Sequence, residues 1–193
     1  MRLLKNQGLQ IRPIKKEDLP FLLSLWNSPK VMRYAGAKHG KGWNMENWYK
    51  RHLERISTEE PEEVQFIIEL ADGTLIGESG CGKVRSGWKC RGYASPSKKR
   101  VVMTDVKLLP RYWGKGYGTE SMKMVVNYLF TKTQTDMVLV PPHKDNIAAM
   151  RVYEKSGFHR TNGVAWHDHL IYEIARSDFE RKTQSGSKES EKT

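Results

Sequence analysis

Three glycines alternate with other residues directly before a helical pattern, and this stretch constrains the fold of the chain more than any other. It reads RYWGKGYGT over residues 111–119. Glycine adopts positive φ without steric cost and, because it has no side chain, lets a ligand approach the main chain closely. The N-terminus of a following helix adds N–H donors and a partial positive charge. The sequence therefore predicts a pyrophosphate site at Gly114, Gly116 and Gly118.

A strand and a helix flank these glycines. Residues 101–110 are rich in β-branched and aliphatic side chains and end at Pro110, which predicts a strand. Beyond the glycines, apolar residues recur at the spacing of one helical face. These residues are Met122, Val125, Val126, Leu129 and Phe130. The predicted order is strand, glycine loop, helix.

Two common nucleotide motifs do not fit the chain. The dinucleotide pattern GxGxxG, counted from Gly114, requires a glycine where Thr119 stands. Residues 77–83, GESGCGK, match GxxxxGK, but Val84 follows in place of the hydroxyl residue that binds Mg²⁺. No helical pattern follows this second motif either. The sequence therefore argues against a nucleotide triphosphatase.

The glycine loop resembles the R/Q-x-x-G-x-G/A signature of the GNAT superfamily, the acyl-CoA-dependent N-acyltransferases, with Arg111, Gly114 and Gly116 at its positions. Residues 146–158, NIAAMRVYEKSGF, are similar to a later helix of that superfamily. The opening segment, residues 11–34, resembles the branch that contains ribosomal-protein N-terminal acetyltransferases.

The resemblance covers about residues 9–176 and implies one α/β (α+β) domain. We expect a central mixed, mostly antiparallel sheet, flanked by helices, that splays near Leu108. Residues 1–8 would form an N-terminal extension. Residues 177–193 contain few apolar side chains, which predicts a disordered tail.

The resemblance also implies acetyl-CoA as co-substrate and no metal. The pyrophosphate would lie on the glycine loop, and the pantetheine arm would bond to the end of the strand as an added strand would. The residues expected to contact acetyl-CoA are Leu108, Leu109, Arg111, Gly114, Lys115, Gly116, Gly118, Thr119 and Asn146. Of these, Thr119 would lend a hydroxyl to the phosphates and Asn146 would hold the pantetheine arm.

Acetyl transfer from a thioester to an amine requires a deprotonated amine, a stabilised oxyanion and a protonated leaving thiolate. The resemblance implies Tyr153 as the acid that protonates the thiolate, and its alternative role is aromatic packing. Asp105 is the candidate base, since it is the one acid in its predicted strand. It could equally pair with Lys107 on the same strand face. Glu69 and Glu78 on neighbouring strands are alternative bases.

Other candidate residues are assigned no catalytic or metal-binding role. His167 and His169 would point to one side of a strand while Asp168 points to the other, so a third metal ligand is missing. The resemblance places Trp26, Trp43 and Trp48 near the acceptor groove. Tryptophans are also typical of a core, and none of the three is assigned to the substrate.

The chain carries a net charge of +11, and much of it is concentrated. From Lys83 to Arg100 there are seven Lys or Arg residues and no acid. This basic segment is either a solvated loop or a docking surface for an acidic substrate, ribosomal RNA or the phosphates of CoA. Trp88 and Tyr93 within it would allow stacking on bases.

Cys81 and Cys90 are the two cysteines, and no apolar run is long enough to span a bilayer. We therefore expect reduced thiols, a cytoplasmic protein and no membrane partner. The preferred acceptor is a protein N-terminus, and the alternative is an aminoglycoside, a polyamine or another small amine. A basic RNA- or ribosome-associated module without catalysis is the alternative of a different class. The oligomeric state is not predicted.

Overall fold

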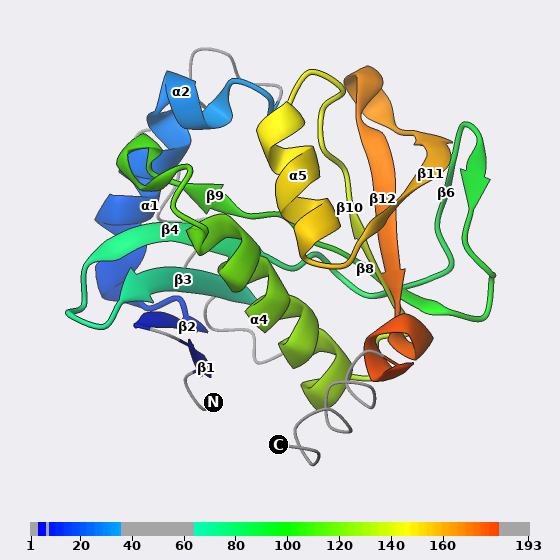
Figure 1. Cartoon of the computed structure of the whole chain (residues 1–193), viewed down its shortest axis with the longest axis horizontal. Coiled ribbons are helices and arrows are strands. Elements are labelled where there is room, and N and C mark those ends of the chain that lie inside the picture. The colour runs from blue at the N-terminus through cyan, green and yellow to red at the C-terminus, as the bar shows by residue number, and fades with distance from the viewer. Residues whose placement is uncertain (1–3, 7, 36–63, 182–193) are drawn as a thin grey trace, which may run out of the picture.

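The computed structural model describes residues 4–6, 8–35 and 64–181 of the chain, whose helices and strands Figure 1 shows. The strands are β1 (Leu4–Asn6), β2 (Leu9–Pro13), β3 (Gln65–Leu70), β4 (Leu75–Gly80), β5 (Arg85–Ser86), β6 (Lys89–Cys90), β7 (Tyr93–Ala94), β8 (Arg100–Met103), β9 (Lys107–Leu108), β10 (Met137–Val140), β11 (His159–Val164) and β12 (Leu170–Ala175). The helices are α1 (Leu19–Asn27), α2 (Pro29–Met32), α4 (Tyr117–Lys132) and α5 (Ile147–Lys155), with 3₁₀ turns η1 (Lys16–Asp18), η2 (Pro110–Tyr112) and η3 (Trp166–Asp168).

Most of the described strands form two five-stranded sheets. The first has the order β1-β2-β3-β4-β9, and all its pairs are antiparallel. The second has the order β11-β12-β10-β8-β5, and in it only β8 and β10 are parallel. The expectation of a mixed, mostly antiparallel sheet flanked by helices is confirmed.

Residues 100–108 carry the chain from the second sheet to the first. β8 pairs with β10, whereas β9 pairs with β4. The Thr104 amide still donates to the Leu139 carbonyl at 2.9 Å, and beyond this point the chain changes partner. The prediction of one continuous strand over residues 101–110 is therefore wrong. The strand is interrupted between Met103 and Lys107, where the two sheets diverge, and this splay precedes Leu108, near which it was expected.

The two faces of the first sheet are covered by different helices. Phe66 and Ile68 of β3 pack in the main core with α4, which runs with α5 along one side of the sheets (Figure 1). Ile67 points the opposite way, because side chains alternate along a strand, and packs against Leu19 and Leu22 of α1. The first sheet therefore has an α4 face and an α1 face, and both meet the splay.

The turns follow the sequence closely. The β3–β4 hairpin turns at Asp72–Gly73 as predicted, with Gly73 at φ +83° and its amide donating to the Leu70 carbonyl. Helix α1 ends before Pro29, as expected. The helix predicted after Asn44 lies outside the described residues.

Residues from the predicted N-terminal extension and from the predicted tail form secondary structure. Part of the predicted N-terminal extension, Leu4–Asn6, forms β1 and pairs with β2. Residues 176–181 form a helical turn, and the Phe179 ring lies 5.3 Å from the Phe130 ring. The partly buried Phe179 ring and the contacts of Asp178 thus hold the first residues of a segment whose composition indicates disorder.

Candidate acetyl-transfer site

The glycine loop between η2 and α4 has an open, left-handed backbone. Gly114 has φ +72° and Gly116 has φ +84°, and a Cβ atom added at either position would meet nothing within 4 Å. Glycine is therefore required by the backbone, and the space above it is free for a ligand. Gly116 is the N-cap of α4, so the first N–H groups of that helix point into the same space.

Gly118 also has a packing role between α4 and α5. It lies in the first turn of α4, and an added Cβ would lie 3.4 Å from Cγ2 of Val152. This glycine allows α4 and α5 to approach closely, whereas Gly114 and Gly116 shape the loop. Its contact with acetyl-CoA, like that of Thr119 beside it, stays a prediction.

Basic and aromatic side chains surround the loop. The Arg111 guanidinium and the Lys115 ammonium both lie over the Tyr112 ring, at 5.2 and 5.6 Å, and both side chains are exposed. Two exposed cations beside an open loop suit a bound pyrophosphate. Sequence analysis missed Trp113, whose Nε1 donates to the Leu108 carbonyl at 2.8 Å. The sequence shows an indole next to the glycines, but it does not show that this indole bonds to the preceding strand.

Strand β9 presents main-chain groups toward the splay. The Leu109 amide donates to the Ile76 carbonyl at 2.8 Å, so Leu109 faces β4. Along an antiparallel ladder the direction of these groups alternates, so the amide and carbonyl of Leu108 face away from β4. The Leu108 carbonyl already accepts from Trp113 Nε1, so the Leu108 amide is the group with which an extended ligand could pair.

Helix α5 places Tyr153 beside this strand. Asn146 caps the helix, its side-chain oxygen accepting from the Ala149 amide at 3.2 Å. Tyr153 is buried, and burial followed by the Asp105 charge raises the pKa of its phenol, against smaller effects of Lys107 and the Val106 backbone. The phenol is therefore protonated at neutral pH, which is the form that an acid requires. The Tyr153 ring also packs in the main core, so its alternative role in packing is fulfilled as well.

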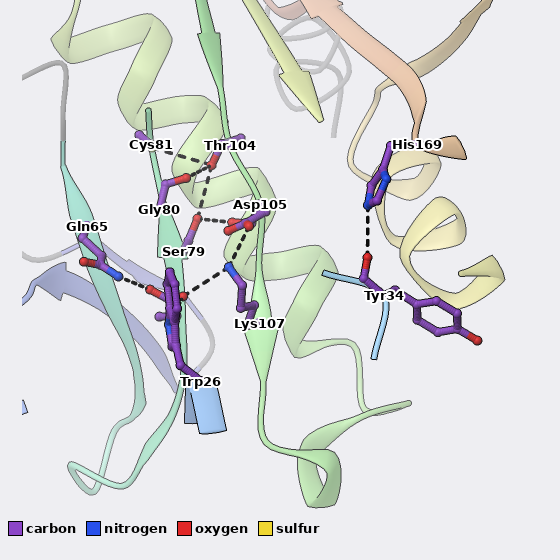
Figure 2. A network of polar contacts seen from close by, with 11 residues as sticks. Trp26, Tyr34, Gln65, Ser79, Gly80, Cys81, Thr104, Asp105, Lys107 and His169 are labelled. Carbon is purple, nitrogen blue, oxygen red and sulfur yellow. Dashed lines mark hydrogen bonds and ion pairs between the residues drawn. The ribbon is translucent and has the colours of Figure 1, made fainter. Parts of the chain in front are cut away.

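A buried cluster of charges lies on the α1 face of the splay (Figure 2). Lys107 Nζ lies 2.6 Å from Asp105 Oδ2 and 3.2 Å from Glu78 Oε1, so the expected pairing of Asp105 with Lys107 exists. Trp26 Nε1 donates to Glu78 Oε1 at 2.7 Å, and the Gln65 amide donates to the other oxygen. Burial lowers the pKa of Lys107, but Asp105 and Glu78 more than offset it, and Lys107 is charged.

The three candidate bases differ in exposure and in partners. Glu69 accepts from Arg12 at 2.9 Å, and Arg12 also pairs with Asp18, so Glu69 belongs to a structural network. The Glu78 side chain is 0% exposed, whereas that of Asp105 is 42% exposed. Of the three, Asp105 is the one that an amine from solvent can reach.

Hydroxyl groups hold the backbone of Asp105 where the strand ladder is interrupted. Ser79 Oγ donates to the Asp105 carbonyl at 2.6 Å, and Thr104 Oγ1 donates to the Gly80 carbonyl at 2.9 Å. Cys81 Sγ lies 3.7 Å from Thr104 Oγ1, and its thiol is free and buried. Side chains therefore replace main-chain pairing between β4 and residues 104–105.

A separate contact joins α2 to the loop before β12 (Figure 2). His169 Nδ1 lies 2.8 Å from the Trp166 carbonyl oxygen, and Nε2 lies 3.0 Å from that of Tyr34. Residues 166–168 form the 3₁₀ turn η3, so the strand on which His167 and His169 would point together is wrong. Among the described residues, no group of three His, Cys, Asp or Glu side chains could hold a metal ion.

The basic segment, Lys83 to Arg100, contains strands β5–β7 and is not one open loop. Lys83, Lys89 and Lys98 are exposed, whereas Trp88 and Tyr93 pack against the apolar cluster on the second sheet. The two rings are therefore partly occupied by packing. No helix in the described part of the chain has the length and apolar character to cross a membrane.

A hollow of about 500 Å³ lies at the N-terminal end of β10, next to Met137, Glu173 and Arg176. Its charged groups already have partners: Glu173 accepts from Tyr93, and Arg176 donates to the Thr133 and Thr135 carbonyls. No residue of α5, of the glycine loop or of residues 104–108 lines this hollow, so it is separate from the splay.

The fold and the loop match proteins of known activity. A family model described as the acetyltransferase (GNAT) domain matches residues 9–159. Aminoglycoside N(6′)-acetyltransferase type 1 of Klebsiella pneumoniae is 36% identical over 186 residues, covering 91% of this chain and 87% of the relative.

Solved structures of acetyltransferases are similar in fold. Spermidine N-acetyltransferase from Vibrio cholerae, in complex with CoA and spermine, superposes with a TM-score of 0.73 at 20% identity, covering 90% of this chain and 99% of that one. Ribosomal-protein-S5-alanine acetyltransferase from Vibrio fischeri has a TM-score of 0.67 at 16% identity, covering 92% and 98%. The chain therefore belongs to the acetyltransferase (GNAT) family, and the prediction of an enzyme that uses acetyl-CoA as its co-substrate is confirmed.

Proposed function

We propose that this enzyme transfers the acetyl group directly from acetyl-CoA to a primary amine of a small cationic acceptor. Asp105 receives the proton of the amine, and Tyr153 gives a proton to the departing thiolate. The observation that carries this assignment is the half-exposed Asp105 carboxylate at the splay, with the buried Tyr153 on the neighbouring helix α5.

The two side chains suit the two proton transfers of the reaction. The amine nitrogen attacks the thioester carbonyl, so a C–N bond forms and the C–S bond breaks. A carboxylate accepts the proton that the amine loses, and a protonated phenol supplies the proton that the thiolate needs. The glycine loop, Arg111 and Lys115 would hold the pyrophosphate, and the Leu108 main chain would pair with the pantetheine arm.

The charge of the site favours a cationic acceptor. Asp105 and Glu78 together carry two negative charges and Lys107 one positive charge, so the cluster retains a net charge of −1. A single ammonium group is attracted to such a site. The 36% identical relative is an aminoglycoside acetyltransferase, and the solved structure from Vibrio cholerae contains spermine.

A protein N-terminus, the acceptor preferred from the sequence, stays a prediction. It rests on the resemblance of residues 11–34 to one branch of the superfamily and on a neighbour of 16% identity that shows the fold alone. The cytoplasmic location also stays a prediction, based on the two cysteines, both of which are free.

A panel of amines tests the proposal. Kanamycin, spermidine and peptides with free N-termini would be incubated with enzyme and acetyl-CoA, and thiol release would be followed together with product mass. We expect turnover of at least one small amine, and Asp105→Asn should lower its kcat by about 10²-fold to 10⁴-fold without changing acetyl-CoA affinity.

The other outcomes separate the alternatives. Acetylation of peptides alone would overturn the small-amine acceptor and support the N-terminal one. Full activity of Asp105→Asn would remove Asp105 from its role. If acetyl-CoA binds but no amine in the panel is acetylated, the proposed small cationic acceptor fails and the acceptor belongs to a class outside the panel.

A further inference from the structure

We infer that Lys107 is a positioning residue of the transfer reaction, which holds the Asp105 carboxylate at the splay by linking it to the buried Glu78. The inference rests on the proposed function and adds to it two residues that touch neither acetyl group nor thiolate. In Figure 2, Lys107 lies between Asp105 and the side chains of Trp26 and Gln65.

Lys107 is fixed from three sides. Its ammonium lies 3.2 Å from Glu78, 2.6 Å from Asp105 and 5.0 Å from the centre of the Trp26 ring. Only 12% of the side chain is exposed. A lysine with two carboxylate partners and an aromatic face has lost most of its rotational freedom, so it can define the place of a carboxylate.

Glu78 is fixed in turn by α1 and β3. It accepts from the Trp26 indole at 2.7 Å and from the Gln65 amide, and it lies directly opposite Lys107 across the β4–β9 ladder. A continuous set of contacts therefore leads from α1, through Glu78 and Lys107, to Asp105. The cluster ends at its single half-exposed member.

A purely structural role explains this arrangement poorly. Desolvating two charges costs free energy, and apolar replacements of a buried ion pair are often neutral or stabilising. The same sheet face buries Ile67 against Leu19 and Leu22, so an apolar pair would fit its surroundings. The buried charges therefore indicate a functional role, and the carboxylate that Lys107 contacts is the proposed base.

The contacts also leave one oxygen of Asp105 for the acceptor. Oδ2 binds Lys107, while the structure assigns Oδ1 no hydrogen bond among the described residues. Ser79 holds the Asp105 main chain at 2.6 Å. With its backbone and one oxygen held, the carboxylate presents the second oxygen in a defined direction. Misplacement by about 1 Å can cost 10²-fold in rate.

Two variants separate positioning from stability. Lys107→Met leaves Glu78 buried without its cation and should lower both the thermal midpoint and kcat. Adding Glu78→Gln removes the unpaired charge. We expect the double variant to recover much of the thermal midpoint while its kcat stays at least tenfold below wild type, with acetyl-CoA affinity unchanged in calorimetry.

Lys107→Arg is the conservative rescue, because it keeps the charge between the two carboxylates, and it should retain more activity than the double variant. A crystal structure of the double variant adds a readout that does not depend on activity. The Asp105 carboxylate should occupy a different or less ordered position in it.

The outcomes distinguish this inference from the proposed function. If the double variant recovers activity together with stability, or if Asp105 keeps its position, the cluster is structural and the inference is overturned. If Asp105→Asn is fully active in the same assay, the proposed base fails, whatever the Lys107 variants do.

Discussion

The α4 side and the α1 side of the transfer site are built in opposite ways. On the α4 side the site is main chain: a left-handed loop at Gly114 and Gly116, the start of α4, and the outward edge of β9. On the α1 side it is a cluster of side chains from four separate segments, with a fully buried carboxylate at its centre.

The difference follows from the ligands that each side would hold. Pyrophosphate is bound by N–H groups that successive residues supply, so one short stretch of sequence suffices. An amine must be placed against one carboxylate, and that requires side chains held from several directions. A main-chain site is consequently sensitive to backbone conformation, and a side-chain site is sensitive to charge balance.

The largest expected effect comes from Gly116→Asp, which should abolish acetyl-CoA binding. The substitution puts a negative charge beside the pyrophosphate in a backbone at φ +84°. Gly73→Asp is a matched control, because Gly73 has φ +83°, equally open surroundings and a place at a distant hairpin. Calorimetry should show loss of binding only for position 116. Micromolar binding by Gly116→Asp would refute the assignment of the loop.

Tyr153→Phe should lower kcat by about 10²-fold to 10⁴-fold and leave acetyl-CoA affinity nearly unchanged, because the ring still packs. Tyr172→Phe is the control, since Tyr172 of β12 is also buried, but its hydroxyl donates to Glu154 at 3.3 Å. Its steady-state kinetics should match those of wild type. If the two variants are equally active, Tyr153 is a packing residue and the acid lies elsewhere.

Sequence predicted the α4 side well because its determinants are local. The spacing of Gly114 and Gly116, the apolar face of α4 and the capping residue Asn146 each depend on a few neighbours in the chain. Gly118 shows the limit of such reasoning. Its spacing suggests the same role as the other two glycines, but its contact is with Val152 on α5, a helix that comes much later in the sequence.

The α1 side was predicted only in part because its determinants are distant in sequence. Strand alternation correctly paired Asp105 with Lys107. Nothing local indicates that Trp26 and Gln65 meet at Glu78, since that follows from β3–β4 pairing and from the packing of α1. The break at residues 104–106 was missed for a similar reason. β-prone side chains do not reveal that a strand changes partner between two sheets.

Cys81 packs in the main core on the α4 face of the first sheet and reports whether that core opens. Burial raises the pKa of its thiol to about 12, and the raised pKa keeps it protonated and unreactive at lower pH. At pH 8 a pKa of about 12 leaves roughly 10⁻⁴ of the thiol ionised. Iodoacetamide should therefore modify the half-exposed Cys90 first, as counted by mass spectrometry of the native protein. Equal labelling of both cysteines would contradict a closed core on the α4 side.

The smallest expected effect concerns the basic segment, Lys83 to Arg100. Lys99 and Arg100 already contact Asp136 and Gln134, so the residues suited to a test are the exposed Lys83, Lys89 and Lys98. Changing all three to Ser should alter kcat/KM for a small amine by less than about twofold, because salt screens exposed charges. Binding to RNA, if wild type shows it, should weaken and lose part of its salt dependence, since each phosphate contact releases counterions. A wild type without salt-dependent RNA binding would leave the segment as a solvated surface. A large loss of acetylation in the variant would instead show that the segment belongs to the transfer site, as a third part beside the α4 and α1 sides.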